Sequence, residues 1–168
     1  REMGVLYGLW HDETGMGWGL SSDIYDSAEY KEVPLSSAEH MISGHADGWV
    51  KGLGEDFLIE IKSIGTGTLR MEAPALLAQN NDNIELAWKN LRNPLRPHIL
   101  QGQVYLHLCH LMVKDGLLES APDEILFIYE LKANQDYKEF VVKYNPELTA
   151  EIFDRALNVA WAVKNTHP

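Results

Sequence analysis

The sequence predicts an α/β domain in which a mixed β-sheet is flanked by helices. A length of 168 residues is typical of one domain. The 45% hydrophobic and 23% charged fractions are ordinary for a globular protein. Helical and strand-like segments also alternate along the chain, as they do when helices cover a sheet. We therefore expect one domain over residues 1–168, with an N-terminal part truncated ahead of Arg1.

The first part of the chain predicts one helix followed by three strands. Apolar residues at helical spacing predict a helix over residues 1–12, which glycines then end. Residues 29–35 suit a short strand, and their proline restricts it to a sheet edge or a strand end. Residues 41–51 and 57–64 predict two strands of a hairpin, with the turn at residues 52–56.

The remainder of the chain predicts helices and a second hairpin. Residues 65–83 are mostly a loop rich in Gly, Thr, Asn and Asp. Pro97 stands where the first turn of a long helix would begin, and Asn145 is a suitable N-cap for the last one. The expected elements are helices near 74–79 and over 84–92 and 98–114, strands over 124–131 and 137–144, and a helix over 147–164.

The charge and the cysteine content exclude several classes of site. Fourteen Lys and Arg against 25 Asp and Glu give a net charge of −11, so bulk attraction would not bring nucleic acid to this surface. A polyanion would have to be held by a local basic strip or by bridging metal ions. One cysteine, Cys109, excludes an internal disulfide and an all-cysteine metal site. It also favours a reducing compartment, and no apolar run has the length of a membrane span.

The strand at residues 57–64 carries the most informative charges. Side chains alternate between the faces of a strand, so Glu60 and Lys62 share one face. The expected hairpin register pairs position 60 with position 47 and places Asp47 beside Glu60. Two adjacent carboxylates repel unless a cation lies between them, and oxygen ligands favour Mg²⁺ or Mn²⁺. The alternative is an ordinary Glu60–Lys62 salt pair with Asp47 as an acid near the turn.

Three short segments resemble motifs of a known nuclease family. Residues 44–47 (Gly-His-Ala-Asp) followed by residues 60–62 (Glu-Ile-Lys) resemble the signature of the PD-(D/E)XK nuclease superfamily. Residues 101–105 (Gln-Gly-Gln-Val-Tyr) resemble the Q-x₃-Y motif of its RecB-type and phage exonuclease branch. The resemblance covers about residues 29–131 and implies a restriction-endonuclease-like αβββαβ core.

The resemblance assigns roles to the residues of the first two motifs. Asp47 and Glu60 would be ligands of Mg²⁺ or Mn²⁺, with the carbonyl of Ile61 as a third ligand. Lys62 would position or activate the attacking water. These residues would hydrolyse a phosphodiester bond, a reaction in which charge neutralisation and alignment dominate.

The third motif and the first predicted helix complete the expected site. By resemblance, Gln101 and Tyr105 support the active site and contact DNA, whereas the alternative is an amide and a phenol buried in the core. Tyr7 stands where the family often carries a histidine ligand in its first helix. His11, one turn later, is the candidate metal ligand there, and a partly exposed helix histidine is the alternative.

Weaker signals lie around this site. Residues 63–68 (Ser-Ile-Gly-Thr-Gly-Thr) are either a phosphate-holding loop or an ordinary flexible one. Trp161 and Val159 are expected in the core. Four residues just before the Q-x₃-Y helix form a basic strip that would meet DNA phosphates or is an ordinary solvated helix end: Lys89, Arg92, Arg96 and His98.

The sequence therefore predicts a divalent-metal-dependent deoxyribonuclease, an exonuclease of phage or recombination type. An endonuclease of the same fold and a catalytically silent nucleic-acid-binding module are the alternatives. The expected partner is single- or double-stranded DNA, without a membrane. A homo-oligomer or a larger recombination or replication assembly, in the cytoplasm of a bacterial or phage-infected cell, is the expected setting.

Overall fold

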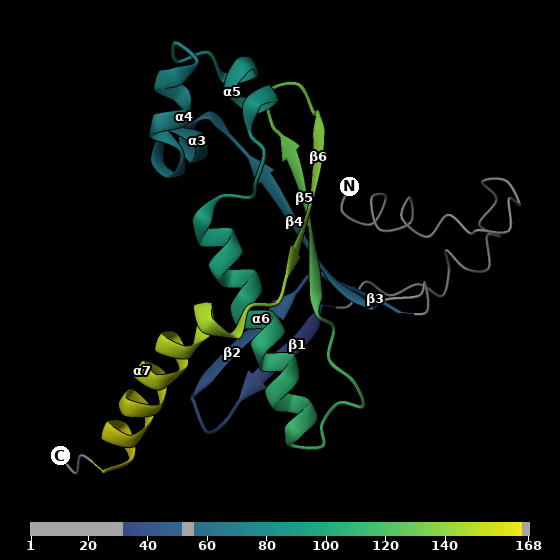
Figure 1. Cartoon of the computed structure of the whole chain (residues 1–168), viewed down its shortest axis with the longest axis vertical. Coiled ribbons are helices and arrows are strands. Elements are labelled where there is room, and N and C mark those ends of the chain that lie inside the picture. The colour runs from purple at the N-terminus through teal and green to yellow at the C-terminus, as the bar shows by residue number, and fades with distance from the viewer. Residues whose placement is uncertain (1–31, 52–55, 166–168) are drawn as a thin grey trace, which may run out of the picture. The chain divides into compact units, whose positions relative to one another are not determined.

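A computed structural model of the chain describes residues 32–51 and 56–165 (Figure 1). The helices and strands below belong to a compact unit that begins at Val33. The helix expected over residues 1–12, and His11 with it, lies outside the described residues. A single domain over the whole chain therefore stays a prediction. Across residues 32–51 and 56–165, no helix combines the length and the apolar character needed to cross a membrane.

The described strands form two sheets. A two-stranded antiparallel sheet joins β1 and β2, and a four-stranded sheet has the order β3-β4-β5-β6. Strands β4 and β5 run parallel while the other pairs run antiparallel, which confirms an α/β fold with a mixed sheet. The strands are β1 (Val33–Ser37), β2 (Ile42–Ala46), β3 (Gly48–Val50), β4 (Phe57–Ile64), β5 (Glu124–Leu131) and β6 (Tyr137–Lys143).

The first hairpin has the predicted register but not the predicted continuity. Gly48 pairs with Ile59, so the same register continued by one residue sets position 47 opposite position 60. The single strand expected over residues 41–51 is wrong. The strand is interrupted at Asp47, and the part before it, β2, pairs with β1 instead. The Asp47 side chain accepts the N–H of Ile61 at 2.7 Å, and a side-chain bond of this kind competes with a continued strand ladder.

Five described helices accompany the strands. The helices expected near 74–79 and over 84–92, 98–114 and 147–164 are confirmed to within a few residues. The loop expected at residues 63–68 is wrong, because Ile64 ends a strand and a helix begins at Thr66. Leu69 is fully buried there, and burial outweighs the low helix propensity of the neighbouring glycine and threonines. The helices are α3 (Thr66–Glu72), α4 (Pro74–Gln79), α5 (Ile84–Asn90), α6 (Arg96–Lys114) and α7 (Pro146–Asn165).

Helix α6 connects the two sheets. It packs against β1 and β2 on one side and against β5 of the larger sheet, and it also contacts α7 (Figure 1). Gly102 permits the approach to β5, because a Cβ at this position would lie 2.7 Å from Cζ of Phe127. Leu106, one turn further along α6, is fully buried with Phe127 in the core.

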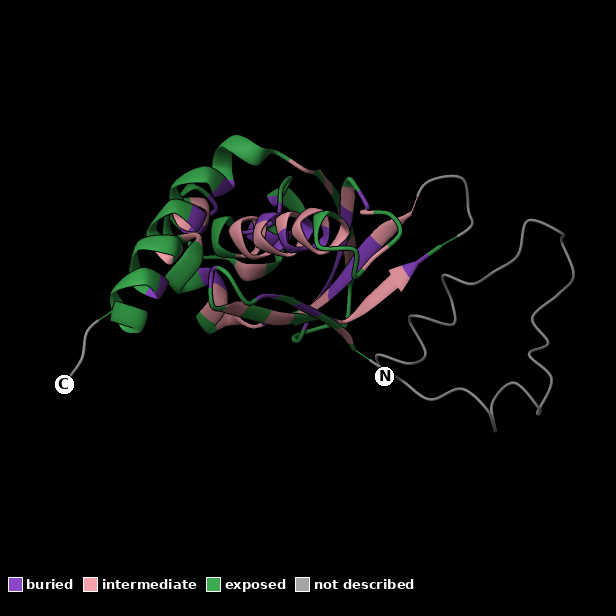
Figure 2. Cartoon of the chain, turned by 90° about the horizontal axis from the view of Figure 1, so that it is seen from below, coloured by how far each residue is buried: buried purple, intermediate pink, exposed green. Residues whose placement is uncertain are grey.

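Helix α7 covers the core with only a narrow stripe. Its buried residues are Thr149, Phe153 and Ala160, and most of the helix is exposed (Figure 2). Trp161 and Val159 are 68% and 62% exposed, so the expectation that they pack in the core is wrong. Helical spacing places them beside the stripe of buried residues rather than on it.

We expect an alanine at Gly102 to lower the free energy of unfolding by about 1–3 kcal/mol, because it overpacks the contact with Phe127. Gly67 is the matched control: it lies within helix α3, where a Cβ would meet nothing within 4 Å. Gly67→Ala should raise the free energy of unfolding by about 0.5–1 kcal/mol through helix propensity. Urea unfolding measures both, and equal effects of the two substitutions would contradict the close α6–β5 approach.

Candidate active site

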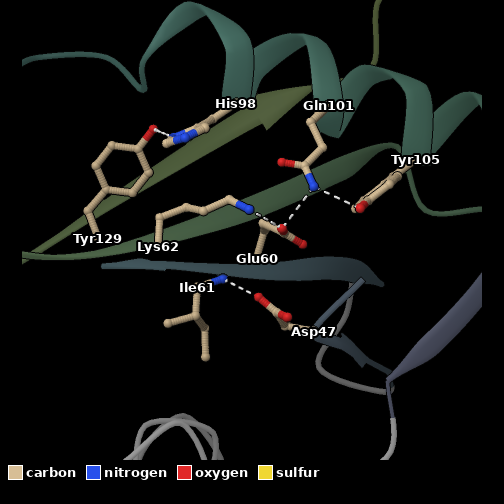
Figure 3. Close-up of polar contacts among 8 residues, drawn as sticks. All are labelled: Asp47, Glu60, Ile61, Lys62, His98, Gln101, Tyr105 and Tyr129. Carbon is tan, nitrogen blue, oxygen red and sulfur yellow. Dashed lines mark hydrogen bonds and ion pairs between the residues drawn. The ribbon is translucent and has the colours of Figure 1, made fainter. Parts of the chain in front are cut away.

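Most residues of the three motifs gather between β4 and α6, and Asp47 lies at the edge of β4 beside Ile61. Glu60 and Lys62 project from the face of β4 that α6 covers (Figure 3). Gln101 and Tyr105 lie one turn apart on α6 and face the same space. Asp47 approaches from the bend between β2 and β3. Folding thus brings together predicted residues that lie nearly sixty positions apart in the sequence.

The two oxygens of the Glu60 carboxylate have different surroundings. The residue is 3% exposed. Its Oε1 accepts hydrogen bonds from Nζ of Lys62 at 2.5 Å and from Nε2 of Gln101 at 3.2 Å. Its Oε2 is buried and has no hydrogen-bond partner among the described residues. A buried polar atom without a partner costs free energy, so this oxygen is an available ligand atom.

The charge of Glu60 is held at an electrostatic cost. Burial raises the pKa of its carboxyl group above the ordinary value, and the bond from Lys62 opposes that rise. The negative charge of the nearby Asp47 raises the pKa further. A cation bound between these two carboxylates would lower the pKa of Glu60 and stabilise its charged form.

Asp47 is held at the open edge of β4. Strand β3 pairs with β4 only as far as Ile59, and beyond that point the Asp47 carboxylate takes the N–H of Ile61. The N–H and C=O of one strand residue point to the same side. The carbonyl of Ile61 therefore lies at the same edge as Asp47, where the sequence expectation placed a third ligand.

The possible metal-ligand atoms of this site are mostly oxygens. The donors are the carboxylates of Asp47 and Glu60 and the carbonyl of Ile61. Within the described ranges, no three His, Cys, Asp or Glu residues cluster as a metal-holding group. The expected ligand His11 falls outside those ranges. A donor set of hard oxygens suits Mg²⁺ or Mn²⁺ better than a soft, thiolate-seeking ion.

Gly44 lets Tyr105 enter the site, a role that the sequence analysis did not identify. A Cβ on Gly44 would lie 2.7 Å from Cε1 of the Tyr105 ring, so the ring packs directly against the backbone of β2. The Tyr105 hydroxyl accepts Nε2 of Gln101 at 2.7 Å. Both residues are half-buried: Gln101 donates to Glu60, and the ring of Tyr105 also packs against the hydrophobic core. The position of Gly44, three residues before Asp47, was the available signal.

His98 adds an element that the sequence analysis misread. Its Nδ1 lies 2.5 Å from the hydroxyl of Tyr129, a buried residue of β5 (Figure 3). Burial first, and then the positive charge of Lys62, lower the pKa of His98 to about 4. His98 is therefore neutral near pH 7 and does not belong to the basic strip, whose members Lys89, Arg92 and Arg96 are exposed. Its position one turn before Gln101 was the signal for a place in the site.

The comparisons with known proteins leave function open. No protein-family model matches the chain, and no curated protein matches it either. A crystal structure of SSO0001 is similar with a TM-score of 0.38 and 18% sequence identity. The similar region covers 74% of this chain and 42% of that one, so this chain spans less than half the length of SSO0001. A likeness at this TM-score does not bear on function.

We expect Glu60→Gln to stabilise the metal-free protein by about 1 kcal/mol at pH 8. The raised pKa of Glu60 means that folding disfavours its charged form, so the destabilisation sets in as pH rises through that pKa and is absent when the carboxyl is protonated. The gain should therefore vanish near pH 4. Denaturant unfolding in EDTA measures it, with Glu139→Gln on exposed β6 as control. A loss of stability at pH 8 would contradict the electrostatic cost assigned to Glu60.

Proposed function

We propose that the protein is a divalent-metal-dependent DNA nuclease that hydrolyses phosphodiester bonds. We propose also that its core is of the restriction-endonuclease-like type that the PD-(D/E)XK resemblance implies. The observation that carries the proposal is the Glu60 carboxylate: Lys62 and Gln101 occupy one oxygen, and the other is buried and unpaired. A buried carboxylate oxygen without a partner costs free energy, and a bound cation would offset that cost.

The residues present fit a bound metal ion. Asp47, Glu60 and the carbonyl of Ile61 would hold Mg²⁺ or Mn²⁺, and the unpaired Oε2 of Glu60 would gain a partner. When bound, such an ion neutralises charge on a phosphodiester and lowers the pKa of a coordinated water. The raised pKa of Glu60 supports this reading, because burial and the charge of Asp47 raise it even with Lys62 bound, and a metal ion would add positive charge there.

Lys62 supplies a positive charge that is both fixed and accessible. Its ammonium is held by Glu60, yet 23% of its side chain remains exposed. In that position it orients a water molecule and stabilises the negative charge that grows on the phosphate during attack. The Glu60 bond keeps the ammonium beside the carboxylates rather than free in solvent.

Gln101 and Tyr105 set the orientation of the Glu60 carboxylate. The amide of Gln101 donates to Oε1 of Glu60 and also to the hydroxyl of Tyr105. This bridge leaves Oε2 as the oxygen that faces a ligand. Both residues act on the reaction through Glu60, so they are positioning residues in this mechanism.

Three exposed cations near the start of α6 support a polyanionic substrate. The protein carries a net charge of −11, but Lys89, Arg92 and Arg96 are exposed and precede Gln101 in the sequence. These cations would attract the phosphates of a nucleic acid to this part of the surface. A small anion would need no such extended basic surface.

Lys62→Ala should lower the rate of DNA hydrolysis by about 100-fold or more, the size of effect expected when a group that stabilises developing charge is removed. Linear duplex, linear single-stranded and closed circular DNA are incubated with the protein and Mg²⁺ or Mn²⁺. Lys114→Ala, at the exposed far end of α6, is the matched control and should cleave normally.

The three substrates separate the readings. Degradation of linear DNA alone indicates an exonuclease, and cutting of the circle indicates an endonuclease of the same fold. A wild-type protein that cleaves none of them would overturn the nuclease proposal in favour of a silent nucleic-acid-binding module. Equal activity of Lys62→Ala and wild type would remove the site assignment.

Asp47→Asn should weaken Mn²⁺ binding by at least about tenfold, because a neutral amide replaces one of the two anionic ligands. Isothermal titration of the protein with Mn²⁺ measures the affinity, and Glu139→Gln is again the surface control. His11→Ala in the same titration reports whether the N-terminal segment supplies a further ligand. Unchanged affinity in Asp47→Asn would show that Asp47 does not ligate the ion.

A further inference from the structure

We infer that His98 is a neutral hydrogen-bond donor of this site and that its Nε2–H binds a DNA phosphate oxygen beside Lys62. The inference rests on the proposed function and names a substrate contact that the three motifs do not contain. His98 stands one turn before Gln101 and two turns before Tyr105 on α6, so the three side chains share the face toward β4 (Figure 3).

The surroundings of Tyr129 determine which nitrogen of His98 carries the proton. Tyr129 is fully buried, and its hydroxyl accepts the N–H of Leu95 at 2.9 Å. The hydroxyl proton needs an acceptor, and among the described residues Nδ1 of His98 is the acceptor within reach, at 2.5 Å. Tyr129 therefore donates to Nδ1, and the proton of the imidazole sits on Nε2.

The same surroundings keep the ring uncharged. Lys62 of β4 is the charged group whose field reaches His98, and Tyr129 of β5 is the titratable group that touches it. A second positive charge on the ring would be repelled by Lys62 and would lose the bond that Tyr129 donates. The ring thus stays a neutral donor over the working pH range, with its orientation set by a buried partner.

The free nitrogen suits a phosphate. No hydrogen-bond partner within the described part of the chain occupies Nε2 of His98, whereas Nδ1 is taken. A nonbridging phosphate oxygen can accept from Lys62 and from a neighbouring imidazole N–H together. The carboxylates of Asp47 and Glu60 repel the same phosphate, so donors on the α6 side are what this site needs to hold it.

Two substitutions separate the donor role from a structural one. His98→Asn places an amide oxygen near the position of Nδ1 and keeps an acceptor for Tyr129, but it has no group at the position of Nε2. His98→Gln places an amide N–H near the position of Nε2 and gives up the bond from Tyr129. The donor role predicts that Gln preserves DNA binding better than Asn, and a structural role predicts the reverse.

Binding is measured by fluorescence anisotropy of a labelled DNA duplex with Ca²⁺ in place of Mg²⁺. His98→Asn should raise the Kd by about tenfold or more, the effect expected when a hydrogen bond to a charged group is lost. His98→Gln should recover most of that loss. The slope of log Kd against log salt should be unchanged in both, since a neutral donor releases no counterion. Glu139→Gln, on exposed β6, is the control and should bind as wild type.

A second readout concerns the imidazole itself. Long-range ¹H–¹⁵N NMR of the free protein should show His98 as the Nε2–H tautomer from pH 5.5 to 8. An Nδ1–H tautomer or a charged ring in that range would overturn the inference without any DNA measurement.

The failures of the inference and of the proposed function are distinct. If wild type binds and cleaves DNA and His98→Asn matches it, the phosphate contact is wrong and the nuclease proposal stands. If wild type with Ca²⁺ binds no DNA, the proposed function fails, and the phosphate contact of His98 fails with it.

Discussion

The organising constraint of this structure is the burial of one negative charge. Glu60 sits in a central strand with almost no exposure to water, and such a charge is costly unless its oxygens have partners. Lys62, two residues along the same strand, and Gln101 from the helix above supply partners for one oxygen. The other oxygen has none among the described residues, and under the proposed function a bound cation would supply one.

Close backbone approach makes this arrangement possible. Helix α6 must lie near both sheets if its polar face is to reach Glu60. Gly102 removes the Cβ that would strike Phe127 of β5, and Gly44 removes the one that would strike the Tyr105 ring. Both glycines serve through the absence of a side chain rather than through an unusual backbone conformation. The position of α6 is therefore determined by steric fit on one face and by hydrogen bonds on the other.

The charged groups and the His98 ring have a definite arrangement in the site. Two carboxylates lie on the β4 side, and the ammonium of Lys62 lies beside Glu60. Burial first, and then the charge of Lys62, lower the pKa of His98 on α6, whose ring contacts the Tyr129 hydroxyl. Adding a second cation beside Lys62 would weaken the hold of Glu60 on that lysine. Under the proposed function, a neutral donor would extend the contact surface toward a phosphate without that cost, and the exposed cations near the start of α6 would supply the long-range attraction.

The sequence alone determined most of the described strands and helices, the hairpin register and the proximity of Asp47 to Glu60, because side-chain periodicity and turn chemistry are local properties. The motifs also singled out Lys62, Gln101 and Tyr105, and the structure places these three side chains in one hydrogen-bonded group with Glu60. Tertiary contacts decided the rest: the break at Asp47, the helix over 66–72, the exposure of Trp161 and the neutrality of His98. Each depends on whether a residue distant in the sequence lies nearby in the fold. The local sequence pattern does not contain that information.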